Sequence, residues 1–456
     1  MKHFNFILVL FISAASFSCE AQKKTAAFDP LKRPKNLSDT ALIELVQKQT
    51  FRYFWDFAHP VSGLARERSN ENFGYGNDVV TIGGTGFGVM SVVVAAERNW
   101  ISRDTAAKFL LKMVNFLLKA DSYHGVFAHW MNGGTGKTIP FSRKDDGADL
   151  VESSYLFQGL LCARQYFNSK DNRVERELRS RINWLWEGVE WNWFTQGGQE
   201  VLYWHWSPNN GWAMNFPVRG FNECLIMYVL AASGDRYPVS PAVYHRGWAE
   251  SNFFNNGKTF YGYKLPLGFD YGGPLFFSQY SFLGLDPRGL KDRYADYWEQ
   301  NQNHTLINYA YCVDNPKEFK GYGENCWGLT AGDTYDGYNA YSPTNDAGTI
   351  TPTAALSAFP YTPDKSMKAL RHFYDDLGDK IWSEYGFVDA FNETKNWYAK
   401  SHLAIDQGPI IVMMENYRTG LLWKLFMSCP EIQAGLKKFD FRSPWLLTQK
   451  IPAVAD

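Results

Sequence analysis

Apolar residues recur along this 456-residue chain at intervals of three and four, the spacing that places side chains on one face of an α-helix. Stretches rich in Gly, Pro, Asn and Tyr separate many of these runs and are typical of long loops. The runs predict helices over residues 41–57, 87–97, 105–119, 150–167, 173–186, 224–232, 241–248, 290–303, 365–377 and 410–426.

Strand-like alternation is scarce and is confined to short pieces such as residues 258–264. About eleven or twelve helices with long connections fit an all-α protein built as an α/α toroid better than an up-and-down bundle, whose loops are short. No Ser/Pro-rich or charged low-complexity segment follows residue 36, so we expect residues 37–456 to form a single domain.

The first 18 residues have the pattern of a secretion signal. Lys2 and His3 precede an apolar run over residues 4–15, and small residues follow. Residues 16–19 resemble a lipoprotein box, which predicts lipidation of Cys19 and a polar tether over residues 19–36; cleavage near Ala21 without lipidation is the alternative. Because Glu20 is not the Asp that retains bacterial lipoproteins at the inner membrane, we expect an exported outer-membrane lipoprotein that faces the periplasm or the surface.

Charge and cysteine usage exclude several classes of protein. The chain has 46 basic and 47 acidic residues, and no basic stripe interleaves with aromatic residues as nucleic-acid binding requires. The cysteines after Cys19 stand at long spacings, and no zinc-binding pattern of Cys and His occurs. We therefore expect buried free thiols, no metal, no cofactor and no nucleic-acid partner, in a monomer that touches the membrane only through its lipid anchor.

Aromatic residues make up 17% of the chain, and many Trp and Tyr lie in loop-like segments rich in Gly and Asn, such as residues 203–206 and 325–328. Aromatic faces in polar loops suit sugar rings, whose C–H faces stack on them while the hydroxyls bind polar neighbours. The composition therefore favours a carbohydrate ligand.

Residues 143–155 carry the densest group of candidate catalytic residues. Asp145, Asp149 and Glu152 are separated by four and three positions, which would place them on one face of a helix. Crowded carboxylates raise the pKa of one another and need solvent, cations or a role in proton transfer. Capping of the helix that begins near Leu150 is the alternative, because acids in a first turn accept free N–H groups.

Glu223, Asp406 and Thr81 stand where other apolar helical runs begin. In a toroid the inner helices point the same way, so these starts would meet on one face. Hydrolysis of a glycosidic bond needs two carboxyl groups, about 5–5.5 Å apart where configuration is retained and about 6.5–9.5 Å apart where it is inverted. Neighbours on one helix have Cβ atoms about 5–6 Å apart, which is tight for inversion. We therefore pair one member of the 143–155 group with Glu223 or Asp406, with helix capping as the alternative role of each.

Candidate substrate-binding residues come from other segments. His129 and Trp130 combine a polar and an aromatic side chain, although His129 would also fit as a hydrogen-bonded core residue. Arg66 opens an Arg-Glu-Arg run, which is either a surface charge cluster or a clamp for sugar hydroxyls. The remaining candidates are Thr81 in the Gly-rich segment 80–88, and Glu324 and Trp327 in the segment 321–328.

Several segments together resemble the glucoamylase-like proteins of glycoside hydrolase family 144, namely residues 80–88, 125–130, 145–155, 221–223, 321–328 and 405–409. The resemblance covers nearly the whole chain after the tether and implies an (α/α)6 toroid. It also implies an inverting enzyme that degrades β-1,2-glucan, either by internal cleavage or by release of sophorose from the non-reducing end. The pocket acids of the family match Asp145, Asp149, Glu152, Glu223 and Asp406, without a division into acid and base.

Two other classes of protein remain open. A non-catalytic surface glycan-binding lipoprotein would share the aromatic loops but would not need convergent acids. A polysaccharide lyase with an α/α toroid would act on acidic glycans and would need a basic groove, whereas the candidate segments here are acidic. The acidic segments therefore favour a hydrolase.

Overall fold

The protein is mostly helical. The computed structural model describes residue 29 and residues 32–70 and 76–447, so the predicted signal segment and Cys19 lie outside the described residues. Within these ranges, no helix is both long enough and apolar enough to cross a membrane. The α-helices are α1 (Asp39–Trp55), α2 (Ile82–Glu97), α3 (Arg103–Leu117), α4 (Leu150–Tyr166), α5 (Arg173–Glu187), α6 (Leu225–Ser233), α7 (Tyr297–Asp314), α8 (Pro352–Leu356), α9 (Pro363–Arg371), α10 (Gly378–Ile381), α11 (Ala404–Arg418), α12 (Leu421–Met427) and α13 (Pro430–Lys438).

The strands are short and pair locally. One three-stranded antiparallel sheet has the order β1-β2-β3, and the other strands form two-stranded antiparallel pairs, with β6 and β7 inside the segment 258–264. The strands are β1 (Val79–Thr81), β2 (Trp130–Asn132), β3 (Thr138–Ile139), β4 (Ala148–Asp149), β5 (His205–Trp206), β6 (Thr259–Phe260), β7 (Tyr263–Lys264), β8 (Ala331–Thr334), β9 (Gly337–Ala340), β10 (Trp382–Ser383), β11 (Gly386–Phe387), β12 (Phe391–Asn392) and β13 (Trp397–Tyr398).

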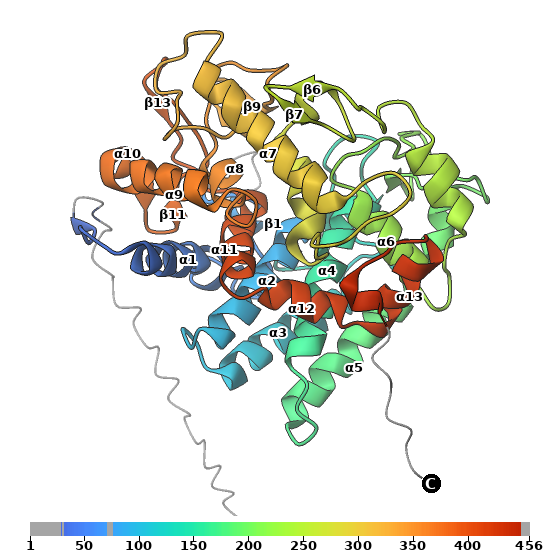
Figure 1. Cartoon of the computed structure of the whole chain (residues 1–456). Helices are drawn as coiled ribbons and strands as arrows, with labels where there is room; N and C mark the ends of the chain where they lie inside the picture. Colours follow the sequence, from blue (N-terminus) through green and yellow to red (C-terminus); the bar gives the residue numbers. More distant parts are fainter. Residues whose placement is uncertain (1–28, 30–31, 71–75, 448–456) are drawn as a thin grey trace, which may run out of the picture.

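Helices α2 and α4 lie side by side at the centre of the molecule (Figure 1). Both are buried around their whole circumference over most of their length, and neither has one distinct polar face. Gly86 allows the two backbones to touch, because a Cβ at this position would lie 2.1 Å from the carbonyl oxygen of Tyr155. This close contact fixes the first turns of α2 and α4 relative to each other.

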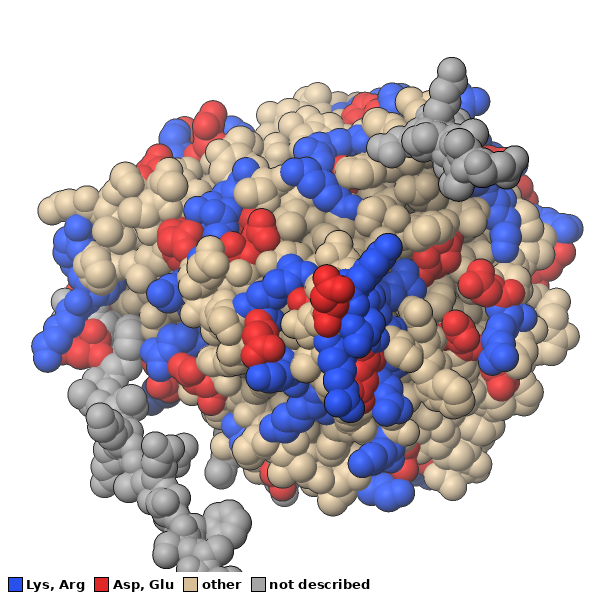
Figure 2. Space-filling model, turned by 90° about the horizontal axis from the view of Figure 1, so that it is seen from below, with Lys and Arg blue, Asp and Glu red and all other residues tan. Residues whose placement is uncertain are grey.

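Helix α11 joins two hydrophobic clusters. Its residues Ile411 and Met413 pack in the larger cluster with α2, α4 and α6, whereas Ile410 and Met414 pack in a second cluster with α1, α8 and α9. The paired strands β6, β7, β9 and β13 lie on one side of the molecule, at the top of Figure 1, and α3 and α5 lie on the opposite side. Figure 2 shows that this lower face carries basic side chains gathered together with acidic ones among them.

Several predicted helices differ in their bounds. The run 410–426 is divided because Gly420 adopts a left-handed conformation with φ of 68°, which ends α11 and starts α12. The run 290–303 begins as irregular backbone, and α7 starts only after Asp296 caps its first turn. The run 241–248 forms a π-helix over Val243–Ala249. The prediction of buried free thiols is confirmed, because the five cysteines in the described part of the chain are buried and unpaired.

Candidate active site

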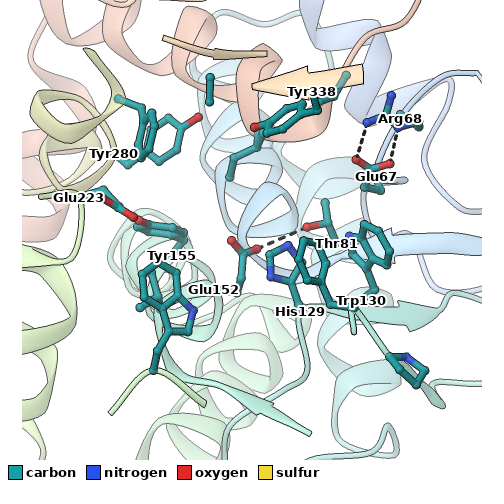
Figure 3. A pocket seen from close by; sticks show the side chains of 18 residues that line it. Glu67, Arg68, Thr81, His129, Trp130, Glu152, Tyr155, Glu223, Tyr280 and Tyr338 are labelled. Carbon is teal, nitrogen blue, oxygen red and sulfur yellow. Dashed lines mark hydrogen bonds and ion pairs between the residues drawn. The ribbon is translucent and has the colours of Figure 1, made fainter. Parts of the chain in front are cut away.

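A cavity of about 530 Å³ lies where the N-terminal ends of α2, α4 and α11 meet the segment that leads into α6 (Figure 3). Three carboxylic acids face it, Glu67, Glu152 and Glu223. Aromatic side chains form much of the remaining wall, namely Trp130, Phe141, Tyr155, Trp204, Phe276, Tyr280 and Tyr338. Such a combination of ring faces and a few polar groups is typical of a pocket for a sugar.

Glu152 stands in the first turn of α4 and points into the middle of the cavity (Figure 3). Its Oε2 accepts hydrogen bonds from the backbone N–H of Gly83 at 2.8 Å and from the hydroxyl of Thr81 at 3.4 Å. Burial, with the charge of Asp149, holds the pKa of Glu152 above its ordinary value, although the charge of His129 lowers it. One oxygen of this carboxyl group is therefore held by the start of α2.

Asp149 has a structural role in α4 and an ion pair beside the cavity. Its Oδ1 accepts the N–H of Glu152 at 2.9 Å, as an N-cap does, and its Oδ2 lies 3.0 Å from Nδ1 of His129. Burial alone would raise the pKa of Asp149, but the hydrogen bond and charge of His129 hold it below the ordinary value. Burial alone would lower the pKa of His129, but Glu152, Asp149 and Asp145 raise it to about 9.

Asp145 lies in the loop that precedes β4, and Asp149 is the residue before α4, so of the three acids only Glu152 lies on the helix. The prediction that all three share a helical face was therefore wrong. The loop turns back so that Oδ2 of Asp145 lies 3.3 Å from Nε2 of His205. Donor atoms of His129, Asp145 and Asp149 lie within 4.8 Å of one another, a spacing that a metal ion could use.

Glu223 lies at the end of the cavity opposite Glu67 and Arg68, two positions before α6 begins (Figure 3). Its carboxyl group is buried, and Oε2 has no hydrogen-bond partner among the described residues. Burial, together with the charge of Glu152, raises the pKa of Glu223 to about 7. A carboxyl group of this kind carries a proton near neutral pH and can donate it.

Asp406 lies in the first turn of α11, behind the cavity wall. Its side chain is 2% exposed and accepts the hydroxyl of Tyr280 at 3.5 Å. A hydrogen bond joins its carboxyl group to that of Asp389, and each of these two acids keeps one oxygen without another partner in the described structure. Burial raises the pKa of both, and repulsion adds to this, so that Asp389 has a pKa of about 7 and Asp406 one well above its ordinary value. The two carboxyl groups therefore share a proton.

Known proteins with related sequences place this arrangement in a family. A curated exo β-1,2-glucooligosaccharide sophorohydrolase (non-reducing end) of Parabacteroides distasonis is 47% identical over 425 residues, which make up 89% of this chain. The chain belongs to the glucoamylase-like family, glycoside hydrolase family 144. The family model Glycoamylase matches residues 215–430. The chain spans 58% of the length of the sophorohydrolase.

Solved structures agree with this membership. An endo-β-1,2-glucanase from Chitinophaga pinensis, solved with sophorotriose and glucose, is 56% identical, with 90% of this chain and 100% of that chain covered and a TM-score of 0.87. A β-1,2-glucanase from Parabacteroides distasonis is 46% identical, with 89% of this chain and 60% of that chain covered and a TM-score of 0.86. The mostly helical fold is therefore that of the glucoamylase-like family.

The structure brings some of the predicted substrate-binding residues to the family's cavity and places others elsewhere. Thr81, His129 and Trp130 line the cavity. Arg66 does not, because its guanidinium donates to the backbone carbonyls of Asn77 and Phe57. Two further predicted residues lie outside the cavity lining as well: Trp327 is fully buried in the second hydrophobic cluster, and Glu324 is exposed beside Lys368. Arg66, Trp327 and Glu324 therefore do not line the cavity, contrary to the prediction that they bind substrate.

The sequence did not identify Glu67 and Arg68, which follow Arg66, or Asp389, which contacts Asp406. Glu67 and Arg68 line the cavity, with Nε of Arg68 2.8 Å from Oε2 of Glu67. Nη1 of Arg68 also lies 3.1 Å from both carboxylate oxygens of Asp333, whose backbone N–H donates to Asp389. The Arg-Glu-Arg run did signal a clamp, but the spacing did not show which arginine faces inward. Nothing in the sequence around Asp389 marks it as a partner of Asp406.

Proposed function

We propose that this protein is a glycoside hydrolase that cleaves β-1,2-glucan or its oligosaccharides with inversion of anomeric configuration. The observation that carries the proposal is that Glu152 and Glu223 face one aromatic-lined cavity from two different helix starts. The similarity to a sophorohydrolase and to an endo-β-1,2-glucanase supports the choice of linkage. Internal cleavage and release of sophorose from the non-reducing end are both compatible with this chemistry.

Glu223 is the general acid in this proposal. Because burial raises its pKa to about 7, it is protonated when substrate binds near neutral pH. Its unpartnered oxygen leaves the carboxyl group free to approach the glycosidic oxygen. As the bond between the anomeric carbon and that oxygen breaks, the proton of Glu223 passes to the leaving hydroxyl group.

Glu152 is the general base. His129, whose pKa of about 9 keeps it cationic, favours the ionised form of Glu152. The N–H of Gly83 holds one oxygen of the carboxylate and so orients the other. A water molecule between this carboxylate and the sugar attacks the anomeric carbon and gives its proton to Glu152, which inverts the configuration. Asp149 and Asp145 then set the charge around the pair, and Asp406 supports the wall behind it, without transferring the proton themselves.

We also propose that the helices form an (α/α)6 toroid and that residues 37–456 are one catalytic domain. The convergence of the starts of α2, α4 and α11 on one cavity supports the toroid. For the N-terminus, the lipoprotein box supports export and anchoring to the outer membrane through Cys19. Replacement of Cys19 by Ala should move the protein from the membrane fraction to the soluble fraction of the cells that make it.

Incubation of the purified protein with linear β-1,2-glucan tests the proposed reaction. Proton NMR of the first products should show the α-anomer, and Glu223→Gln should lower kcat by about 10²–10⁴-fold because the proton donor is lost. A β-anomeric first product would overturn inversion. Binding of glucan without cleavage would support the glycan-binding protein instead, and unsaturated products would support a lyase. The size of the earliest products separates internal cleavage from release of sophorose.

A further inference from the structure

A second cavity, of about 510 Å³, adjoins the first. Arg68 and Tyr338 line both cavities, and Tyr338 belongs to the β8–β9 hairpin. The far wall of the second cavity is the segment from Trp397 to Ser401, which contains β13. None of the roles assigned above to the catalytic acids uses this cavity.

We propose that the second cavity binds glucosyl units of the same β-1,2-glucan chain whose scissile bond lies in the first cavity. The proposal rests on the proposed glucan hydrolase activity and deepens it. It makes the cleft longer than the catalytic cavity, so that a bound chain continues past the β8–β9 hairpin.

The wall shared by the two cavities is rigid enough to guide a chain. Arg68 is 8% exposed, and its guanidinium is held on one side by Glu67 and on the other by Asp333. Ser401 also donates a hydrogen bond to Asp333, which ties the far wall to the same arginine. In contrast, Tyr338 is 53% exposed and presents its ring at the boundary between the cavities.

The far wall offers a ring face and a hydrogen-bond donor that suit a sugar. Trp397 is half-buried, and no other aromatic side chain of the described ranges is recorded against its indole ring. The neighbouring Tyr398 is engaged, because Nζ of Lys380 donates to its hydroxyl at 2.8 Å and Phe391 stacks on its ring. Lys400 is exposed at the cavity and can donate to sugar hydroxyls. Trp397 is therefore the ring of the far wall that can stack on a sugar.

Kinetics on substrates of two lengths test the proposal. Trp397→Ala should lower kcat/KM on long linear β-1,2-glucan by roughly five- to tenfold, the size expected for loss of one aromatic contact. On the shortest β-1,2-glucooligosaccharide that the wild-type protein cleaves, kcat/KM should stay within twofold, because a short chain fills only the first cavity. Trp184→Ala is the matched control, since Trp184 is 73% exposed on α5 and lines neither cavity.

Equal losses on both substrates, or no loss on either, would overturn the second binding site while wild-type cleavage stands. Failure of the wild-type protein to cleave β-1,2-glucan is a different result and overturns the proposed function. Trp397 packs against the second hydrophobic cluster, so Trp397→Ala can fail to fold. In that case Trp397→Leu keeps apolar packing and removes the flat ring face, and Trp397→Phe should restore most of the activity on long glucan. Trp397→Leu should then have a lower kcat/KM than Trp397→Phe on long glucan, and the two variants should be alike on the shortest substrate.

Discussion

Two groups of buried acids lie near the cavity, and they have different neighbours. At the start of α4, Asp149 and Glu152 lie beside His129, and His205 pairs with Asp145. Behind α11, Asp406 and Asp389 have mainly each other, and Arg68 reaches only as far as Asp333. We call these the α4 group and the α11 group.

Burial does not explain the difference between the two groups. The side chains of Asp149, Asp389 and Asp406 are 0%, 3% and 2% exposed. Yet the pKa of Asp149 lies below its ordinary value, whereas the pKa of Asp389 rises to about 7. The charged neighbours differ: a histidine cation lowers the pKa of a buried carboxyl group, and a second carboxyl group raises it. For Glu152, beside the same histidine, burial outweighs this lowering and the pKa stays above its ordinary value. A general base belongs in the first kind of surroundings.

The largest expected effect compares one acid from each group. Glu152→Gln should lower kcat on β-1,2-glucan by about 10²–10⁴-fold, because it removes the group that accepts the proton of the attacking water. Asp406→Asn should lower kcat by less, since the amide resembles the protonated acid that Asp406 already is. Steady-state kinetics of both variants near pH 7 measure the difference. A loss for Asp406→Asn as large as that for Glu152→Gln would assign the base to the α11 group.

A smaller effect on activity is expected from the glycines that touch each group. A Cβ at Gly83 would lie 2.5 Å from Oε2 of Glu152, so Gly83→Ala must displace this carboxylate. We expect kcat to fall by roughly tenfold, equivalent to about 1.4 kcal/mol in the barrier. Gly332→Ala is the matched variant in the α11 group, because its Cβ would lie 3.0 Å from Oδ2 of Asp389. Equal losses of kcat in both variants would show that activity does not depend more on the position of Glu152 than on that of Asp389.

The α11 group should make stability depend on pH in the acidic range. The pKa of Asp389 is about 7 in the folded protein against 3.8 ordinarily, so the folded state holds the extra proton between these values. The free energy of unfolding should therefore fall as pH rises from about 4 to 7, by up to about 1.4 kcal/mol per pH unit. In Asp389→Asn this slope should be flatter. Urea unfolding at several pH values measures it, with the exposed Asp171→Asn as a control that leaves the slope unchanged.

Much of the helical framework could be predicted from the sequence, because apolar spacing is a local property. The start of α4 was predicted at Leu150, where it lies, whereas α11 begins at Ala404, six residues before the predicted run 410–426. Acids were predicted at both starts. The exceptions have local causes as well. One is Gly420, which divides the run 410–426, and another is Asp296, which starts α7 late. The spacing of apolar residues predicts a helix but does not predict these backbone conformations.

The site could be predicted only in part. Residues at helix starts, such as Glu152 and Glu223, were found because a helix fixes where its first turn points. Arg68, which lines the cavity, and Asp389, which lies behind its wall, were not found. Their positions depend on contacts distant in sequence, such as that between Arg68 and Asp333, which are 265 residues apart. The spacing of Asp145, Asp149 and Glu152 was misleading for a related reason: the chain enters α4 only after Asp149.

The smallest expected effect concerns the histidine of the α4 group. The pKa of His129 is about 9 in the folded protein against 6.5 ordinarily, so its stabilising charge is fully present below about pH 6.5 and is lost as pH rises through 9. The wild-type free energy of unfolding should fall across this window, by less than about 1.4 kcal/mol per pH unit because His129 is partly exposed. His129→Gln should abolish this decline and leave the decline between pH 4 and 7 intact, whereas His124→Gln, outside the cavity lining, should change neither.

Because the cation also lowers the pKa of Glu152, the acidic limb of the kcat profile should move to higher pH in His129→Gln. An unmoved acidic limb would show that His129 does not keep the base ionised, and the contrast between the two groups would then lose its meaning for catalysis.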